Sequence, residues 1–488
     1  MVITHIGKLI VTSDAATIVQ EIEVQHPAAK MIAMAAQMQE KEAGDGTNFV
    51  LTLCGELMQQ AENLIQEGLH PSDILVGYEK ASKKCLEYLE SLVSYQIEDI
   101  RNETEIQKCI KSVVAAKHYG NEDILVPLIS QAAIYAMPGD AKEFSVENVR
   151  VTKILGGGLS DSKVIHGMCV IRGSETTCHK VADARVAVFN NPLEADSGDT
   201  KGTVLLKTAE ELANYTRGEE ECMERFVKKL ADAKINVVIS GGSISEVCLH
   251  YMEKYNIMLL RIHSKFEVKR IATTLGGSIL VRLDAPTPEE VGTASEVYTS
   301  EISSTQCTIF KRDEKDNRIA TIILRASTTN LLDDAERAID DGVNTIKNMT
   351  KNPAFCAGGG ATEIHLASQI QTFSKCQPGL DQYAVERFGQ AFEIIPRTLA
   401  ENAGLNAEEI IAKLYSETAK SPFYGLDVAD GTIKDMKEMD ILDSLESKSW
   451  GIKLAVDAVL TILKVDQIIM SKPAGGPNQR EARAPDLD

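Results

Sequence analysis

The fold of this chain is constrained most by the order of its hydrophobic patterns. The patterns are typical of helices at both ends of the chain and of strands in the middle. Apolar residues recur every three or four positions over residues 48–68 and 71–92, which predicts two long helices. Two further stripes, at 388–399 and 450–462, predict helices near the C-terminus, with a kink at Pro396. Such ends can share one core only if the chain returns to where it began.

Short apolar runs of the β type occupy the middle of the chain. They lie at residues 235–239, 257–262 and 320–324, and a helical pattern at 219–233 precedes the first of them. Glycine triplets stand at the transitions, and 488 residues leave room for several domains. We therefore predict a multidomain, mostly α protein whose helical ends form one discontinuous domain around an α/β insertion.

Charge and cysteine content exclude several classes of protein. The net charge is −20 and the pI about 5.0, so the surface repels phosphate backbones and anionic lipids, and we expect no nucleic-acid or membrane partner. The ten cysteines include no CxxC pair and no cluster at zinc-ligand spacing, as expected for reduced thiols. Without a signal-peptide pattern or a long uncharged apolar run, we expect a soluble, cytoplasmic protein.

A glycine-rich loop, Gly44-Asp45-Gly46-Thr47-Asn48, stands directly before the first long helix. Glycines let backbone approach a ligand, N–H groups at a helix start attract anions, and an aspartate there can complete the shell of a phosphate-bound Mg²⁺. The alternative is an Asp-Gly turn that only caps the helix, and the local sequence favours it.

A second glycine-rich segment, Gly358-Gly359-Gly360, precedes another helical pattern that starts at Ala361. Three consecutive glycines lose much chain entropy on folding, so they mark a place where backbone passes close to something. The local sequence leaves a hinge or strand contact and a ligand loop equally open.

Two acidic residues are candidates for chemistry. Asp341 projects away from the apolar stripe of its predicted helix, so it can act as a general base on a water molecule. A solvated acidic helix face is the simpler reading of that segment. Asp14 is either a helix N-cap or a second acidic group beside a metal. His26, before a proline, is expected to cap or pack only.

Six segments occur in order along nearly the whole chain: SDAATIV (13–19), HPAAKM (26–31), GDGTN (44–48), GGGATE (358–363), LAENAG (399–404) and KVDQII (464–469). Taken together, they resemble the group II chaperonins. The longer segments EVQHPAAKM (23–31), GDGTNFVL (44–51), DDGVNT (340–345) and VDQIIM (465–470) are similar, within that family, to theta subunits of the eukaryotic cytosolic chaperonin, CCT or TRiC.

The resemblance implies a chaperonin fold, with a discontinuous helical equatorial domain, an intermediate hinge domain and an α/β apical domain that carries a lid protrusion. The boundaries it implies are equatorial 1–99 and 358–470, intermediate 100–172 and 319–357, apical 173–318, and a disordered tail at 471–488.

It also implies that the chain is an ATPase that uses ATP and Mg²⁺. Asp45 would bind the Mg²⁺, while Asp341 would orient the attacking water and take its proton, with Asp14 beside it. The residues that would bind the nucleotide are Gly44, Gly46, Thr47 and Asn48 at the phosphates, Gly358 and Gly359 close by, and Asp443 at the ribose.

The implied partners are paralogous subunits of a hetero-oligomeric double ring and unfolded cytosolic proteins such as cytoskeletal proteins. ATP hydrolysis would close the lid over these clients. A helix at 243–254 matches the family's client-facing helix, and its exposed side would carry Ser245, Glu246, His250 and Glu253, a mixed polar set that favours selective contacts.

The chain departs from the family in one main respect. Family members carry, ahead of the position that matches Met1, a Gly-Pro phosphate loop followed by a lysine. A subunit without that loop would hydrolyse ATP weakly or serve only as a non-hydrolysing scaffold that binds clients. Ala357 also replaces a usual proline and Asn48 a commoner threonine, and neither change removes a charge. A Mg²⁺-dependent metabolic enzyme is a further alternative, but no nucleophile–base pair supports it.

Overall fold

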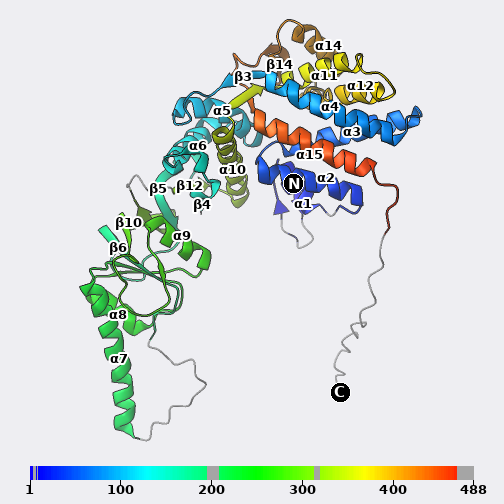
Figure 1. The fold of residues 1–488 in the computed structure, drawn as a ribbon. Coiled ribbons are helices and arrows are strands. Elements are labelled where there is room, and N and C mark those ends of the chain that lie inside the picture. The colour runs from blue at the N-terminus through cyan, green and yellow to red at the C-terminus, as the bar shows by residue number, and fades with distance from the viewer. Residues whose placement is uncertain (4–6, 8, 23, 195–207, 313–318, 470–488) are drawn as a thin grey trace, which may run out of the picture.

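The structure is a computed structural model that describes residues 1–3, 7, 9–22, 24–194, 208–312 and 319–469. Helices from both ends of the chain lie together at the top of Figure 1, and the α/β part inserted between them lies at the bottom. The tail predicted at 471–488 lies outside the described residues.

The upper part is built from helices of both chain ends around one core. The buried side chains of this core come from residues 35–92 and 354–460, which confirms the prediction of a discontinuous helical domain. Its helices are α1 (Ala15–Glu21), α2 (Pro27–Glu42), α3 (Thr47–Gln66), α4 (Pro71–Ser91), α11 (Ala361–Ser374), α12 (Asp381–Ala391), α13 (Ile394–Asn402), α14 (Ala407–Thr418) and α15 (Leu445–Leu463).

A small antiparallel sheet joins the two ends of the chain. Its strand order is β16-β13-β3, with β3 (Val93–Gln96), β13 (Ala354–Ala357) and β16 (Leu442–Ser444). The register pairs Cys356 with Asp443, so the end of β13 and the glycine triplet that follows it lie beside that aspartate. Two hairpins complete this part, β1 (Val2–Ile3) with β2 (Leu9–Ile10) and β14 (Tyr424–Asp427) with β15 (Thr432–Asp435).

A large curled sheet runs from the middle of the molecule into the lower part. Its strand order is β4-β12-β5-β11-β10-β6-β7-β8, and β9 pairs with β6. The strands are β4 (Val149–Leu155), β5 (Lys163–Val170), β6 (Lys180–Phe189), β7 (Val237–Ser240), β8 (Met258–Arg261), β9 (Ile279–Leu280), β10 (Gly292–Ile302), β11 (Thr305–Lys311) and β12 (Ala320–Ala326). The predicted β runs correspond to β7, β8 and β12.

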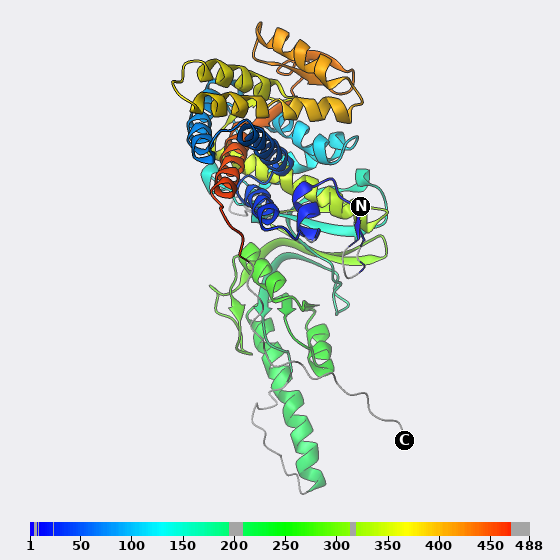
Figure 2. The same cartoon turned by 90° about the vertical axis from the view of Figure 1, so that its right-hand side faces the viewer.

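Helices cover the two ends of this sheet differently. In the middle of the molecule, α5 (Glu103–Lys117), α6 (Glu122–Ala136) and α10 (Thr329–Lys351) share a core with β4 and β12. At the far end lie α7 (Ala209–Asp232), α8 (Glu246–Lys254) and α9 (Lys265–Leu275), and Figure 2 shows the long α7 extending along the lower part. Short 3₁₀ turns lie at Ala141–Glu143, Val146–Asn148 and Leu159–Asp161. None of the described helices is both long enough and apolar enough to cross a membrane.

The interruption predicted at Pro396 lies one turn earlier, where the chain divides into α12 and α13 at residues 392–393. A proline lacks the N–H that would bond the carbonyl four residues earlier, which here is that of Phe392. The predicted core face of the last helix was wrong. In α15 the predicted stripe at 450–462 is only half-buried, and the core face is the adjacent one, with Ile452, Val456 and Val459.

Removing a large side chain from the shared core tests its contribution to stability. Phe388 is fully buried and meets Tyr78 edge to face, so Phe388→Ala should lower the free energy of unfolding of the helical part by about 3–5 kcal/mol. The fluorescence of Trp450, the only tryptophan and a residue of α15, reports this part in a urea titration. Phe266→Ala, at a residue 76% exposed on α9, is the control and should cost less than about 0.5 kcal/mol. Equal losses would contradict the shared core.

Candidate functional site

The loop before α3 is held in a conformation that requires its glycines. Gly44 and Gly46 have φ of 73° and 81°, a region that L residues rarely adopt. A Cβ on Gly44 would also lie 2.2 Å from Cβ of Asn344 on α10. The carbonyl of Asp45 accepts hydrogen bonds from Gln39 Nε2 (2.8 Å) and Ser447 Oγ (3.1 Å). The loop is thus fixed against α2, α10 and α15.

Three helix starts without side-chain caps open on one cavity. The N-cap residues are Gly46 for α3, Gly360 for α11 and Ser444 for α15, and none of them makes a side-chain cap hydrogen bond. All three line the cavity. Their first N–H groups therefore lack the usual side-chain partner, and helix N-termini attract anions.

The cavity has a volume of about 550 Å³ and is lined by two kinds of side chain. The charged ones are Asp45, Glu363, Asp427, Asp443 and Lys448. The mainly apolar ones include Tyr119, Ile395, Leu399, Leu426, Val428 and Ile441. A ligand with an anionic part and a flat apolar part would match this lining.

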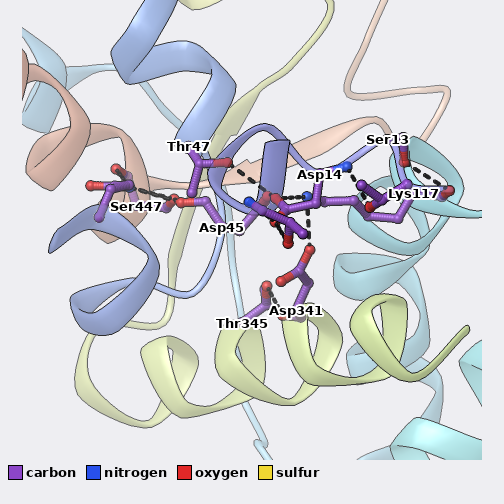
Figure 3. A network of polar contacts seen from close by, with 11 residues as sticks. Ser13, Asp14, Asp45, Thr47, Lys117, Asp341, Thr345 and Ser447 are labelled. Carbon is purple, nitrogen blue, oxygen red and sulfur yellow. Dashed lines mark hydrogen bonds and ion pairs between the residues drawn. The ribbon is translucent and has the colours of Figure 1, made fainter. Parts of the chain in front are cut away.

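Beside Asp45, a buried lysine links two of the predicted acidic residues (Figure 3). Lys117 Nζ, at the end of α5, lies 2.9 Å from Asp14 Oδ1 and 3.1 Å from Asp341 Oδ2. Asp14 also caps α1, because its Oδ2 accepts from the N–H and hydroxyl of Thr17. Thr47 Oγ1 donates to Asp14 Oδ1 at 3.4 Å. The structure thus confirms Asp14 as an N-cap and adds its ion pair with Lys117, whereas its place beside a metal stays a prediction.

The surroundings of these carboxyl groups move their pKa values apart. Burial raises the pKa of Asp341 well above its usual range, and the charge of Lys117 offsets this only in part. Burial likewise raises the pKa of Asp45. Burial alone would raise the pKa of Asp14 too, but hydrogen bonds from Thr17 and the charge of Lys117 lower it to about 2. Asp14 therefore stays ionised at neutral pH, whereas Asp341 accepts a proton more readily than an ordinary aspartate.

The structure brings most of the predicted site residues together. Asp45, Gly46, Gly359 and Asp443 line the cavity, and a Cβ on Gly358 would lie 3.3 Å from Asp443 Oδ2.

Five predicted residues lie beside the cavity or away from it. Gly44 lines an adjacent hollow with Asp14 and Asp341. Thr47 is buried against Asp14, whereas Asn48 is exposed and lines neither space.

The glycine triplet makes a strand contact as well as lining the cavity. Leu426 N donates to Gly359 O at 2.9 Å, and a Cβ on Gly359 would lie 3.0 Å from the Leu426 carbonyl. The strand contact that the sequence left open is therefore confirmed, and the ligand loop stays a prediction that the place of Gly359 at the cavity allows.

The sequence reasoning missed two lysines and a serine. Lys117 and Lys448 stand in no glycine-rich or acidic motif, so only their burial among carboxylates identifies them. Ser444 directly follows Asp443, and its buried Oγ has no hydrogen-bond partner.

The residues at the cavity fit a magnesium nucleotide better than a metal held by protein alone. Among the described residues, no group of three or more His, Cys, Asp or Glu side chains is placed to hold a metal ion. Mg²⁺ needs only one or two carboxylates when phosphate oxygens complete its shell. Asp45 is placed to supply one of them beside two uncapped helix starts.

The predicted client-facing helix begins later than expected. α8 starts at Glu246, with Ser245 as its N-cap. Glu246 and His250 are exposed, but Ser245 and Glu253 are half-buried, and Glu253 Oε1 accepts from Thr177 N at 3.3 Å. Only two of the four predicted residues are therefore freely exposed.

Comparisons with known proteins agree with one another. The family model described as the TCP-1/cpn60 chaperonin family matches residues 1–473. T-complex protein 1 subunit theta of Gallus gallus is 49% identical over 480 residues, covering 98% of this chain and 87% of the relative. That of Dictyostelium discoideum is 46% identical over 489 residues, with coverages of 100% and 91%. An open-state monomer of a group II chaperonin from Methanococcoides burtonii matches with a TM-score of 0.65 and 28% identity, covering 86% of this chain and all of that one.

Replacing Lys117 tests its role in the acidic cluster. Lys117→Met leaves two buried carboxylates without their cation and should cost about 3–5 kcal/mol of stability at pH 8. The loss should shrink toward pH 5, because Asp341, whose pKa is already raised, can then take a proton. Urea unfolding at the two pH values measures both effects.

An exposed lysine with two carboxylate partners provides the control for this test. Lys153 also contacts two carboxylates, Asp333 and Glu336, but all three side chains are about one-third exposed. Lys153→Met should cost no more than about 1 kcal/mol at either pH. A Lys117→Met cost that did not change with pH would contradict the assigned coupling to Asp341.

Proposed function

The chain belongs to the TCP-1/cpn60 chaperonin family, as its motifs predicted, and we propose that it is an ATP-hydrolysing chaperone subunit of a hetero-oligomeric double ring. One observation supports the proposal that the chain binds ATP. Three uncapped helix starts and several carboxylates meet at one cavity that is also lined by apolar side chains. The proposed partners are paralogous chaperonin subunits and unfolded cytosolic proteins, in the cytoplasm.

The charged and the apolar residues that line the cavity would contact different parts of the nucleotide. The N–H groups at Gly46 and Gly360 would bind the polyphosphate, while Asp443 would accept from the ribose hydroxyls. The base would lie against Leu426, Val428 and Tyr119. A Mg²⁺ ion held by Asp45 would neutralise charge on the phosphates.

Hydrolysis needs a group that takes a proton from water, and in this proposal that group is Asp341. Its raised pKa makes it a better proton acceptor than an ordinary carboxylate. Asp14 stays ionised and holds Lys117, which would keep the ammonium in place as Asp341 gains its proton. Phosphoryl transfer requires little more than such positioning and charge balance.

The split of the site between parts of the molecule supports coupling to domain movement. Asp45 belongs to the helical part, whereas Asp341 lies on α10 in the middle part, with the boundaries given by the resemblance. α10 reaches the loop through Asn348 Nδ2, which donates to Ala43 O at 2.7 Å. Closure of the middle part over the nucleotide would therefore complete the site, so hydrolysis and lid closure would occur together.

Replacing the proposed base tests the ATPase. In the assembled complex, Asp341→Asn should lower kcat of this chain's site by about 100- to 10,000-fold and leave ADP binding in place. The wild-type kcat should rise with pH on its acidic limb, because Asp341 must be ionised to accept a proton. Steady-state turnover and ADP titration measure these effects, and Asp340→Asn, one residue away, is the control. If the wild-type chain binds ADP but does not hydrolyse ATP, the result would favour a non-hydrolysing subunit instead.

Native size and client capture test the chaperone role. Sedimentation of the tagged chain should place it with paralogous subunits at many times 53.2 kDa. The variant Glu246→Lys/His250→Asp should sediment in the same way but carry less unfolded client, because it changes the exposed face of α8. Lys228→Glu, an exposed charge reversal on α7, is the control. Sedimentation alone near 53.2 kDa would overturn the ring assignment.

A further inference from the structure

A second cavity lies at the junction between the middle part of the molecule and α9. It has a volume of about 390 Å³, and α9 lies where the curled sheet passes toward the lower part (Figure 1). The charged side chains that line it are those of Glu147, Arg150, Lys269 and Arg270. Three cations therefore stand against one carboxylate, in a chain whose net charge is −20. Such a local excess of positive charge attracts anions.

The three cations make no bonded contacts with the part of the chain that the structure describes. Neither an ion pair nor a side-chain hydrogen bond is formed there by Arg150, Lys269 or Arg270. Arg325, on the neighbouring strand β12, is different, because its Nε donates to Gly156 O at 3.0 Å. A half-buried guanidinium normally has such acceptors. Arg150 is half-buried, so its donors are available to a ligand.

Like charges lie close together at this cavity. Burial and the charge of Arg270 lower the pKa of Arg150, and the carboxylates of Glu147 and Asp340 offset this shift only in part. Arg150 still stays a cation at neutral pH, because a guanidinium does not lose its proton in a protein. The repulsion between the two guanidinium groups therefore remains, and an anion between them would relieve it.

The lining also indicates which kind of anion fits. Three cations and one carboxylate leave two positive charges uncompensated, which the dianion of one phosphate monoester balances. The fork of an arginine matches pairs of phosphate oxygens. Phe266, which is 76% exposed, and Met168 add apolar surface beside the cations. A small ligand with a ring next to its phosphate would therefore match this lining.

We propose that this cavity binds a small phosphate monoester, whose phosphate group lies between Arg150 on β4 and Arg270 on α9, with Lys269 beside them. With the boundaries given by the resemblance, Arg150 belongs to the middle part and α9 to the apical part. A bound phosphate would join two parts that repel one another at this point, and it would oppose their separation. The cavity shares no lining residue with the one beside Asp45, so this inference does not depend on the proposed function.

Two matched anions test the proposal. Phenyl phosphate is mainly a dianion at neutral pH, and phenyl sulfate has the same ring and one negative charge. Both are titrated by calorimetry into the full chain, in the assembly in which it is isolated. Phenyl phosphate should bind about tenfold more tightly than phenyl sulfate. Arg150→Gln/Arg270→Gln should weaken phenyl phosphate binding by about tenfold or more, because it removes charge-assisted contacts.

A control variant and the double variant locate the binding. Lys228→Gln removes an exposed charge on α7 and should leave phenyl phosphate binding unchanged. Binding that survives in full in Arg150→Gln/Arg270→Gln would place the probe elsewhere, such as at the cavity beside Asp45, and would overturn the proposal. Equal affinity for the two anions would overturn it as well.

Thermal unfolding separates a binding site from a structural charge cluster. Without ligand, Arg270→Gln should leave the melting temperature unchanged or raise it, because no bonded partner is lost and one like charge is removed. Saturating phenyl phosphate should raise the melting temperature of the wild type but not that of Arg150→Gln/Arg270→Gln. A lower melting temperature of Arg270→Gln without ligand would show a structural role and contradict the proposal.

Discussion

The burial of one ammonium between two carboxylates is the interaction on which the arrangement of the site depends. Lys117 ends α5, Asp14 precedes α1 and Asp341 lies on α10, so the contact joins three segments that are far apart in sequence. A buried charge is costly unless its partners are in place. The helical part and the middle part must therefore pack so that these three side chains meet. The same packing also brings Asp45 close to Asp341.

The sequence predicted the helices and the glycine loops because their signals are local. The stripe at residues 48–68 and the positive φ needed at Gly46 and Gly359 are set by neighbours in the chain. The buried face of α15 was misjudged, because it depends on what packs against the helix. The same holds for Lys117 and Lys448, since a lysine outside a motif looks the same whether it is solvated or buried.

Structural contacts hold two of the candidate groups in place. Asp14 caps α1 with one carboxylate oxygen and binds Lys117 with the other. The glycine triplet contacts β14 and lines the cavity at the same time. Such contacts would keep these groups where the proposed chemistry needs them, so a structural role at a residue does not exclude a functional one.

The two buried lysines differ in what they can respond to. Lys117 belongs to the middle part and faces the carboxylates proposed for hydrolysis, whereas Lys448 belongs to the helical part and faces those proposed for binding. Movement of α5 and α10 relative to α3 would change the first set of contacts and leave the second intact, because Lys448, Phe49, Glu363 and Asp443 all lie in the helical part. Under the proposed function, a nucleotide would therefore stay bound to the helical part, and the hydrolytic groups would meet it only on closure.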